Sequence, residues 1–495
     1  MTEPRSRSSG LIVLTLATAV VMGASAAPGT TGLSKSPGYE ESTKRGEVVR
    51  DAPEAEAPDK APATAGNLTP ADQAVIAAAI GRLKRDLLAE CMLTAAERKA
   101  LGPGRKAAAG DDHKAPAPDQ AALLLEADKR LTIALGLAEK KGKVPANLAK
   151  RLTWGMGEET LIGLALVKAG VSPNHPLIEQ IWDDLRKGER AQDETKRGIF
   201  TYKAGLGLML VEAMEHSPSG DTWPPITDNK KVSQWVNRVA GELMAAGYHG
   251  GWGYGPVGGT YHDHSNTQYA ALGLKAARLS GWKPDATASF NVWDAVRNHF
   301  LKGQAKTGPN VNLLVQLETQ GMGGVDYTSE AWKKSPGQDH AYEAAAQARG
   351  WAYRCDKSYR PDFNMTIAGL TAMILARSEL GAAVENEAKE AKRKADAASA
   401  DLAIRDAMAW VQGNWGGALD GYGLYGIERL GVLGNLAKIG GHDWYGELAP
   451  KLAAKVMSGE NIVTNGLSTV RTQKAFYLLF LVRGTSSAYA GAAAQ

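Results

Sequence analysis

The strongest constraint on the fold is a short helix pattern that recurs along the chain. Each copy starts with a polar or aromatic residue, has a small residue near its middle and continues into leucine. A glycine inside a helix costs about 1 kcal/mol relative to alanine. Its recurrence therefore indicates close approach between helices, and recurrence of one unit indicates a repeat architecture. The copies occupy residues 160–164, 202–208, 270–274, 366–370, 422–427 and 475–479.

Amphipathic segments with a tryptophan or bulky apolar stripe alternate with these copies, as expected for partner helices. Residues 120–137 supply a sixth partner if the ring closes end to end. No run of alternating residues indicates a strand. We therefore predict an all-α fold, an α6/α6 toroid of alternating inner and outer helices. The other five partners occupy residues 178–185, 232–243, 292–300, 402–411 and 442–452.

Glycines and insertions mark the ends of several predicted helices. Gly170, Gly281, Gly381 and Gly431 lie where a helix end favours a left-handed residue. Insertions over residues 303–343 and 385–394 interrupt the alternation. The second insertion is a charged run, which we interpret as a solvated extension of a helix.

The first residues have the features of an export signal. Arg5 and Arg7 precede an apolar stretch at residues 11–22, which is short for a membrane span, and small residues follow at 24–26. We predict a signal peptide over residues 1–26 and an exported product, periplasmic or secreted, without a stable membrane anchor. An uncleaved anchor is the alternative.

Composition divides the rest of the chain. Residues 27–70 are rich in Ala, Pro, Glu, Lys and Ser, which is typical of a disordered linker. A short helical segment follows at 71–104, either a docking element or a spacer, and then a second linker at 105–118. The toroid is expected over residues 119–484, with a tail at 485–495. We expect the toroid to fold without the segments before it.

Charge and cysteine content exclude some functions. A net charge of +4, spread along the chain, gives no basic patch for nucleic acid. Cys91 and Cys355 are too few for a disulfide framework in an exported chain. A single bridge between them stays open, although the peripheral position of Cys91 favours unpaired thiols.

Tryptophan-containing loops carry a resemblance to a known family. Residues 250–254 (Gly-Gly-Trp-Gly-Tyr) and 347–351 (Gln-Ala-Arg-Gly-Trp), with a shorter echo at 412–415, are similar to the repeats of the squalene-cyclase and prenyltransferase-β superfamily. Residues 440–444 and 476–481 resemble its exported bacterial branch, which carries prenyltransferase/squalene oxidase repeats. The resemblance implies an α/α toroid around a central cavity.

The same resemblance locates a catalytic position. Cyclases of this superfamily carry Asp-x-Asp-Asp-Thr at an inner-helix start, where the middle aspartate protonates an alkene. Residues 263–267 here read Asp-His-Ser-Asn-Thr. Ser265 replaces the acid, and a hydroxyl cannot protonate a carbon–carbon double bond. The resemblance therefore implies that the usual cyclase chemistry is absent and leaves Asp263 as the catalytic candidate.

Metal and cofactor motifs are incomplete. His262 and His264 form a His-x-His pair, but a third ligand at fixed spacing is missing. In protein prenyltransferases a zinc-binding cysteine follows an aspartate by two residues, whereas Cys355 precedes Asp356. Two Gly-x-Gly-x-x-Gly segments follow no predicted strand. We expect no metal and no cofactor, with helix capping by Asp263 or Ser265 as the simpler role of this region.

Polar and aromatic residues near inner-helix starts are the ligand-binding candidates. We predict that the central cavity binds an isoprenoid-like or glycan-like (carbohydrate) ligand. The alternatives are an active enzyme, either terpenoid-modifying or a polysaccharide lyase or hydrolase, and a structural interaction module. A deep apolar cavity would favour an isoprenoid, a carboxylate-lined cleft a glycan, and a filled centre the structural module. The candidates are Trp252, Tyr254, His262, His264, Asn266, Gln268, Trp351, Asn364, Asp420, Tyr422 and Tyr425.

Overall fold

A computed structural model describes most of the helical region. The predicted signal peptide and tail, and nearly all of the linkers, lie outside the described residues. All described residues belong to one compact unit within residues 60–495. They are residues 68–93, 132, 135–136, 157–187, 200–247, 250–254, 262–284, 291–317, 333–334, 341–355, 360–380, 387–416, 419–434, 436–460, 462 and 468–483.

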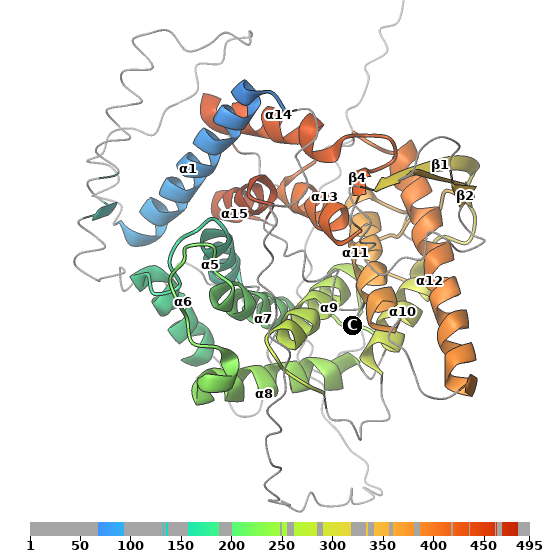
Figure 1. Ribbon diagram of the computed structural model, residues 1–495, viewed down its shortest axis with the longest axis horizontal. Helices are drawn as coiled ribbons and strands as arrows, with labels where there is room; N and C mark the ends of the chain where they lie inside the picture. The colour runs from blue at the N-terminus through green and yellow to red at the C-terminus, as the bar shows by residue number, and fades with distance from the viewer. Residues whose placement is uncertain are drawn as a thin grey trace, which may run out of the picture. The chain divides into compact units, whose positions relative to one another are not determined.

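The six recurring segments all form helices, as predicted. Each helix contacts the next one along the chain, and α15 contacts α5, so that the contacts form a closed cycle (Figure 1). Apart from the first turn of α15, most residues of these helices are buried, which explains why they show little amphipathic periodicity. They are α5 (Glu158–Lys168), α7 (Thr201–Glu215), α9 (His264–Leu279), α11 (Phe363–Leu380), α13 (Gly421–Leu433) and α15 (Val470–Leu481).

The predicted partner segments form a second set of helices, which lie outside the first (Figure 1). Residues 387–394 extend α12 as one continuous helix, in agreement with the interpretation of the charged run. Among the described residues, no helix combines the length and apolar character needed to cross a bilayer. The second set comprises α6 (Pro176–Lys187), α8 (Lys230–Gly247), α10 (Val292–Gly303), α12 (Glu387–Gly413) and α14 (Trp444–Ser458), and a 3-10 turn η1 (Ile226–Asp228) precedes α8.

Glycine permits the closest approach in the first set, between α7 and α9. A Cβ atom added at Gly273 would lie 2.6 Å from the Cα atom of Gly205, and one added at Gly205 would overlap the carbonyl oxygen of Tyr269. Backbone atoms cannot move aside as a flexible side chain can. The predicted packing role of the recurring glycines is therefore confirmed at this crossing.

Helix α1 (Pro70–Met92) is part of the core. It contacts α14 and α15 and also reaches α5 and α6, where the chain of contacts closes. Ala79, Leu83 and Leu87 are fully or almost fully buried on its inner face. The prediction that the toroid folds without this segment is inconsistent with that burial. Residues 120–137, predicted as the sixth partner, lie almost entirely outside the described residues.

The prediction that no strands are present is wrong. Strands β1 (Asn310–Leu317), β2 (Lys333–Lys334), β3 (Ala341–Gln347) and β4 (Leu436–Lys438) form an antiparallel sheet in the order β2-β3-β1-β4. Most of this sheet lies in the insertion predicted over residues 303–343. Alternating Val311, Leu313 and Val315 in β1 carry the period-2 signal, which is too short to stand out between long helices.

Candidate functional site at the start of α9

The tryptophan loop before α9 holds the helix start in place. The backbone NH of Trp252 donates to Thr267 Oγ1 at 3.2 Å. Its indole Nε1 donates to the carbonyl oxygen of Leu243, near the end of α8, at 2.9 Å. Trp351 makes the equivalent bonds to Thr366 at 3.1 Å and to Phe300 at 2.7 Å. Each indole therefore caps an outer helix while its backbone anchors an inner one.

These bonds give Trp252 and Trp351 structural roles. Their exposed fractions are 1% and 0%. A Cβ added at Gly247 or Gly369 would overlap the respective indole ring. Both rings are thus enclosed by the helices that they join. The prediction that they contact a ligand does not fit this packing, because sequence alone does not show what surrounds an indole ring.

Asp263 is the N-cap of α9. Its two carboxylate oxygens accept hydrogen bonds from the backbone NH and the side-chain amide of Asn266, both at 2.8 Å. Burial raises the pKa of the Asp263 carboxyl to about 6, although the hydrogen bonds from Asn266 oppose the shift. The side chain satisfies the helix end, as the capping interpretation predicted.

Hydroxyl groups converge beside this cap. Ser265 Oγ lies between the hydroxyls of Tyr202 and Tyr422, and Tyr422 donates to Gln268 Oε1 at 3.0 Å. Tyr202 stacks on Tyr254, with ring centroids 5.8 Å apart, and the hydroxyl of Tyr254 accepts from Tyr353 at 2.8 Å. We call this set the hydroxyl network; its members are Tyr202, Tyr254, Ser265, Gln268, Tyr353 and Tyr422.

Side chains fill the space next to the hydroxyl network. The guanidinium of Arg429 lies 4.3 Å from the ring centroid of Tyr425 and 5.3 Å from that of Tyr269. All three residues are essentially inaccessible to solvent. Cation–π attraction compensates part of the cost of burying this charge. Tyr425 is therefore a packing residue of α9 and α13.

The remaining predicted residues lie around the same helix starts. Asp420 is the N-cap of α13 and accepts from the backbone NH of Gly423 at 2.9 Å. Asn364 donates to Asp420 at 3.4 Å, so these two are near each other. His262 is half-buried, and its ring lies 6.4 Å from that of His299.

His264 belongs to a cluster that the sequence did not reveal. Its side chain meets His299 from α10 and Cys355 from the loop before α11, and their possible ligand atoms lie within 4.8 Å of one another. The His-x-His pair was expected to bind no metal because a third ligand is missing at fixed spacing. His264 and Cys355 lie 91 positions apart, a separation at which no spacing motif operates. No disulfide joins Cys355 to Cys91, which is buried in α1.

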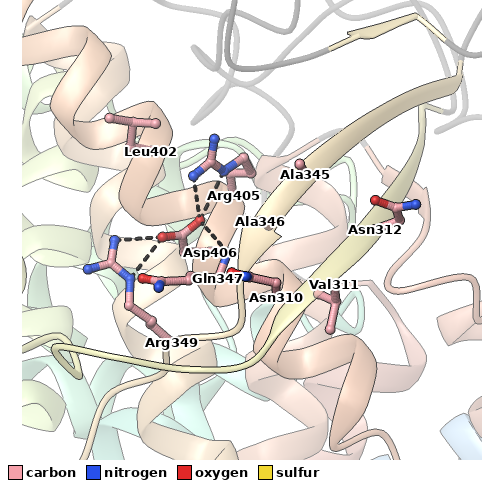
Figure 2. A pocket seen from close by; sticks show the side chains of 10 residues that line it. All are labelled: Asn310, Val311, Asn312, Ala345, Ala346, Gln347, Arg349, Leu402, Arg405 and Asp406. Atoms are coloured by element: carbon pink, nitrogen blue, oxygen red, sulfur yellow. Dashed lines mark hydrogen bonds and ion pairs between the residues drawn. The ribbon is translucent and has the colours of Figure 1, made fainter.

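A separate hollow of about 720 Å³ lies between the sheet and α12 (Figure 2). Asp406 at its floor accepts from Arg349 at 2.6 and 2.8 Å and from Arg405 at 2.7 and 2.9 Å. Both guanidinium groups are already bound to this carboxylate, and the lining also includes the amide side chains of Asn310, Asn312 and Gln347. No sequence motif indicates this hollow, because its walls include β1 and β3.

Comparisons with family models, curated proteins and solved structures find no match to this chain. The resemblance to the squalene-cyclase superfamily therefore stays a prediction. The described residues define a mostly helical protein with two clusters of polar side chains at the start of α9: the hydroxyl network and the His264, His299 and Cys355 cluster.

Proposed function

We propose that this chain is an exported α6/α6 toroid that binds a glycan-like ligand at the start of α9. The observation that carries the proposal is the hydroxyl network, which draws side chains from α7, α9, α13 and two loops. Tyrosine rings offer flat faces for a sugar ring, and their hydroxyls both donate and accept hydrogen bonds. A long isoprenoid would need an apolar lining, so the polarity of this network supports the glycan-like class.

The network has an accessible end and a buried end. Tyr254 is 41% exposed, whereas Gln268 is completely buried. Within the part of the chain that the structure describes, Gln268 Nε2 has no hydrogen-bond partner. A buried donor without a partner costs about 1–3 kcal/mol. A ligand hydroxyl or carbonyl oxygen that accepts from this amide would recover that free energy, which supports binding along the network.

Cyclase chemistry is not part of the proposal. Ser265 occupies the position of the family acid and holds Tyr202 and Tyr422 through its hydroxyl. Both oxygens of the neighbouring Asp263 are occupied by Asn266. We expect no cyclised product when the purified protein is incubated with squalene and the extract is analysed by mass spectrometry. Turnover that disappears in Asp263→Asn would contradict this expectation.

The binding test uses two variants at the exposed end. The full chain is titrated by calorimetry with cello- and chito-oligosaccharides, and with geranylgeraniol as the isoprenoid probe. We expect binding of an oligosaccharide, a large loss in Tyr254→Ala and a smaller loss in Tyr254→Phe, which keeps the stacking face. If geranylgeraniol binds and the oligosaccharides do not, the ligand belongs to the isoprenoid class.

The filled space around Arg429 favours a second candidate, a structural interaction module. Tyr269, Tyr425 and Arg429 leave no room among themselves for a ligand. If neither oligosaccharides nor geranylgeraniol bind to the folded chain, the structural module becomes the better account and the hydroxyl network serves as packing.

A further inference from the structure

The cluster of His264, His299 and Cys355 has the dimensions of a metal site. Cys355 Sγ lies 3.5 Å from His264 Nε2 and 3.6 Å from His299 Nε2. Zinc binds thiolate sulfur at about 2.3 Å and imidazole nitrogen at about 2.0–2.1 Å in tetrahedral geometry. These bond lengths place sulfur and nitrogen ligands about 3.5 Å apart. Both sulfur–nitrogen distances thus match the spacing around a tetrahedral zinc ion, and the possible ligand atoms of all three side chains lie within 4.8 Å of one another.

Both imidazole rings are held in the tautomer that a metal requires. His264 Nδ1 is hydrogen-bonded to the carbonyl oxygen of Ala352, and His299 Nδ1 to that of Gly250 at 2.9 Å. A carbonyl oxygen only accepts, so each Nδ1 carries the hydrogen and each Nε2 keeps its lone pair. An outer partner on the second ring nitrogen is the usual arrangement around metal-binding histidines.

The imidazole side of the cluster is enclosed by the protein. The exposed fractions of His264 and His299 are 0% and 6%. Cys355 is only partly buried, so that solvent can reach the sulfur side of the cluster.

Two glycines make room for the cluster. A Cβ added at Gly303 would overlap His264 Nε2 and would lie 3.1 Å from Cys355 Sγ. A Cβ added at Gly251 would lie 2.5 Å from His299 Nδ1, and the φ angle of Gly251, +154°, also favours glycine. The backbone therefore leaves space where the ligand atoms of His264 and Cys355 face each other.

The geometry points to a three-ligand zinc site formed by His264, His299 and Cys355, with the fourth position open to solvent. This donor set comes from α9, α10 and the loop before α11. It differs from the Asp-x-Cys pattern considered in the sequence analysis. A site with three protein ligands and one open position is typical of zinc that binds an exchangeable water or ligand. The inference does not depend on glycan binding.

Cobalt(II) provides the test, because it replaces zinc and reports its ligands by colour. The full chain, reduced and freed of metal with a chelator, is titrated with Co²⁺. We expect one equivalent to produce tetrahedral ligand-field bands and a thiolate-to-cobalt charge-transfer band, and zinc to remove both. Cys355→Ser should lose the charge-transfer band. His299→Gln should weaken binding by more than the roughly 10- to 100-fold expected for loss of an outer partner.

Matched control variants test whether cobalt binds to this cluster and not to other cysteines and histidines of the chain. Cys91→Ala and His442→Gln should keep the wild-type spectrum, because neither residue belongs to the cluster. Gly303→Ala removes no ligand but places a methyl group against His264 Nε2, so it should weaken cobalt binding while circular dichroism remains native. A folded wild-type chain that binds no Co²⁺, or a Cys355→Ser variant that keeps the charge-transfer band, would overturn the site.

Discussion

The loops that lead into α9 and α11 use the same residues for the same contacts. In each loop the backbone NH of a tryptophan donates to a threonine one turn inside the helix: Trp252 to Thr267 and Trp351 to Thr366. In each loop the tryptophan carbonyl oxygen accepts from the backbone NH of the aspartate that caps the helix. The repeated residues therefore build the scaffold.

The two helix starts differ in the residues that follow the cap. His264 and Ser265 follow it in α9, whereas Phe363 and Asn364 follow it in α11. His264 reaches the metal-site cluster and Ser265 joins the hydroxyl network. Scaffold substitutions should thus affect both starts alike, whereas substitutions after the cap should have functional effects only at α9.

The largest expected effect is loss of either tryptophan. Trp252→Ala and Trp351→Ala should each lower the free energy of unfolding by about 3–5 kcal/mol, because each empties a buried indole site. Urea denaturation followed by circular dichroism measures both. Trp252→Phe should recover part of the loss, since it restores the ring but not the bond to Leu243. A Trp252→Ala variant that is as stable as the wild type but does not bind the glycan would show that Trp252 contacts the ligand.

The next largest effect is expected at a glycine where two helices touch, compared with a glycine that has no close neighbour. Gly273→Ala should destabilise the fold by about 1–3 kcal/mol, because the new methyl group meets the backbone of Gly205. Gly241→Ala is the control: a Cβ at this α8 position meets nothing within 4 Å. It should stabilise the fold by up to about 1 kcal/mol. Equal changes in the free energy of unfolding at both sites would show that the backbones of α7 and α9 are too far apart for this contact.

Loss of the caps should have a smaller effect. Asp263→Ala and Asp362→Ala each remove a carboxylate that accepts from a backbone NH in the first turn, at 2.8 and 2.9 Å. The usual cost is about 1 kcal/mol. We expect Asp263→Ala to cost more, because it also removes the carboxylate oxygen that accepts from the buried side-chain amide of Asn266. Thermal denaturation of both variants, with Asp263→Asn as the conservative control, checks the order.

The helices could be predicted from the sequence because each helix carries its pattern within its own residues. The recurring segments located all six helices of the closed cycle. Gly170 and Gly281 have the predicted positive φ angles of 81° and 89°, and Gly381 lies outside the described residues. Gly431 was predicted to end a helix, but it lies inside α13, where a Cβ would overlap the indole of Trp444. A glycine signals either a turn or a close contact, and sequence position alone does not distinguish them.

The candidate site could be predicted only in part. The polar run in α9 was recognised from its position at a helix start. His299 and Cys355 had no local signal, because their role arises from the packing of α10 and of the α11 loop against α9. The burial of α1 and the pairing of β1 with β3 likewise depend on contacts between distant segments. Such contacts do not follow from the periodicity of either segment alone.

The smallest effect on stability, and the clearest on function, is expected at the second residue after the cap. Ser265→Ala removes a hydroxyl shared by Tyr202 and Tyr422, and Asn364→Ala removes a long bond to Asp420. Tyr422 keeps its bond to Gln268, so Ser265→Ala should cost only about 0.5–1.5 kcal/mol.

The functional outcomes of this pair should diverge. Ser265→Ala should weaken oligosaccharide binding in calorimetry, because Tyr202 and Tyr422 lose the hydroxyl that orients both rings toward a ligand. Asn364→Ala should bind like the wild type, because the described residues at the start of α11 form no such network. Cobalt spectra should remain unchanged in both variants, since neither supplies a ligand to the cluster of His264. If both substitutions weakened binding equally, the ligand would span both helix starts, and the contrast between α9 and α11 would not hold.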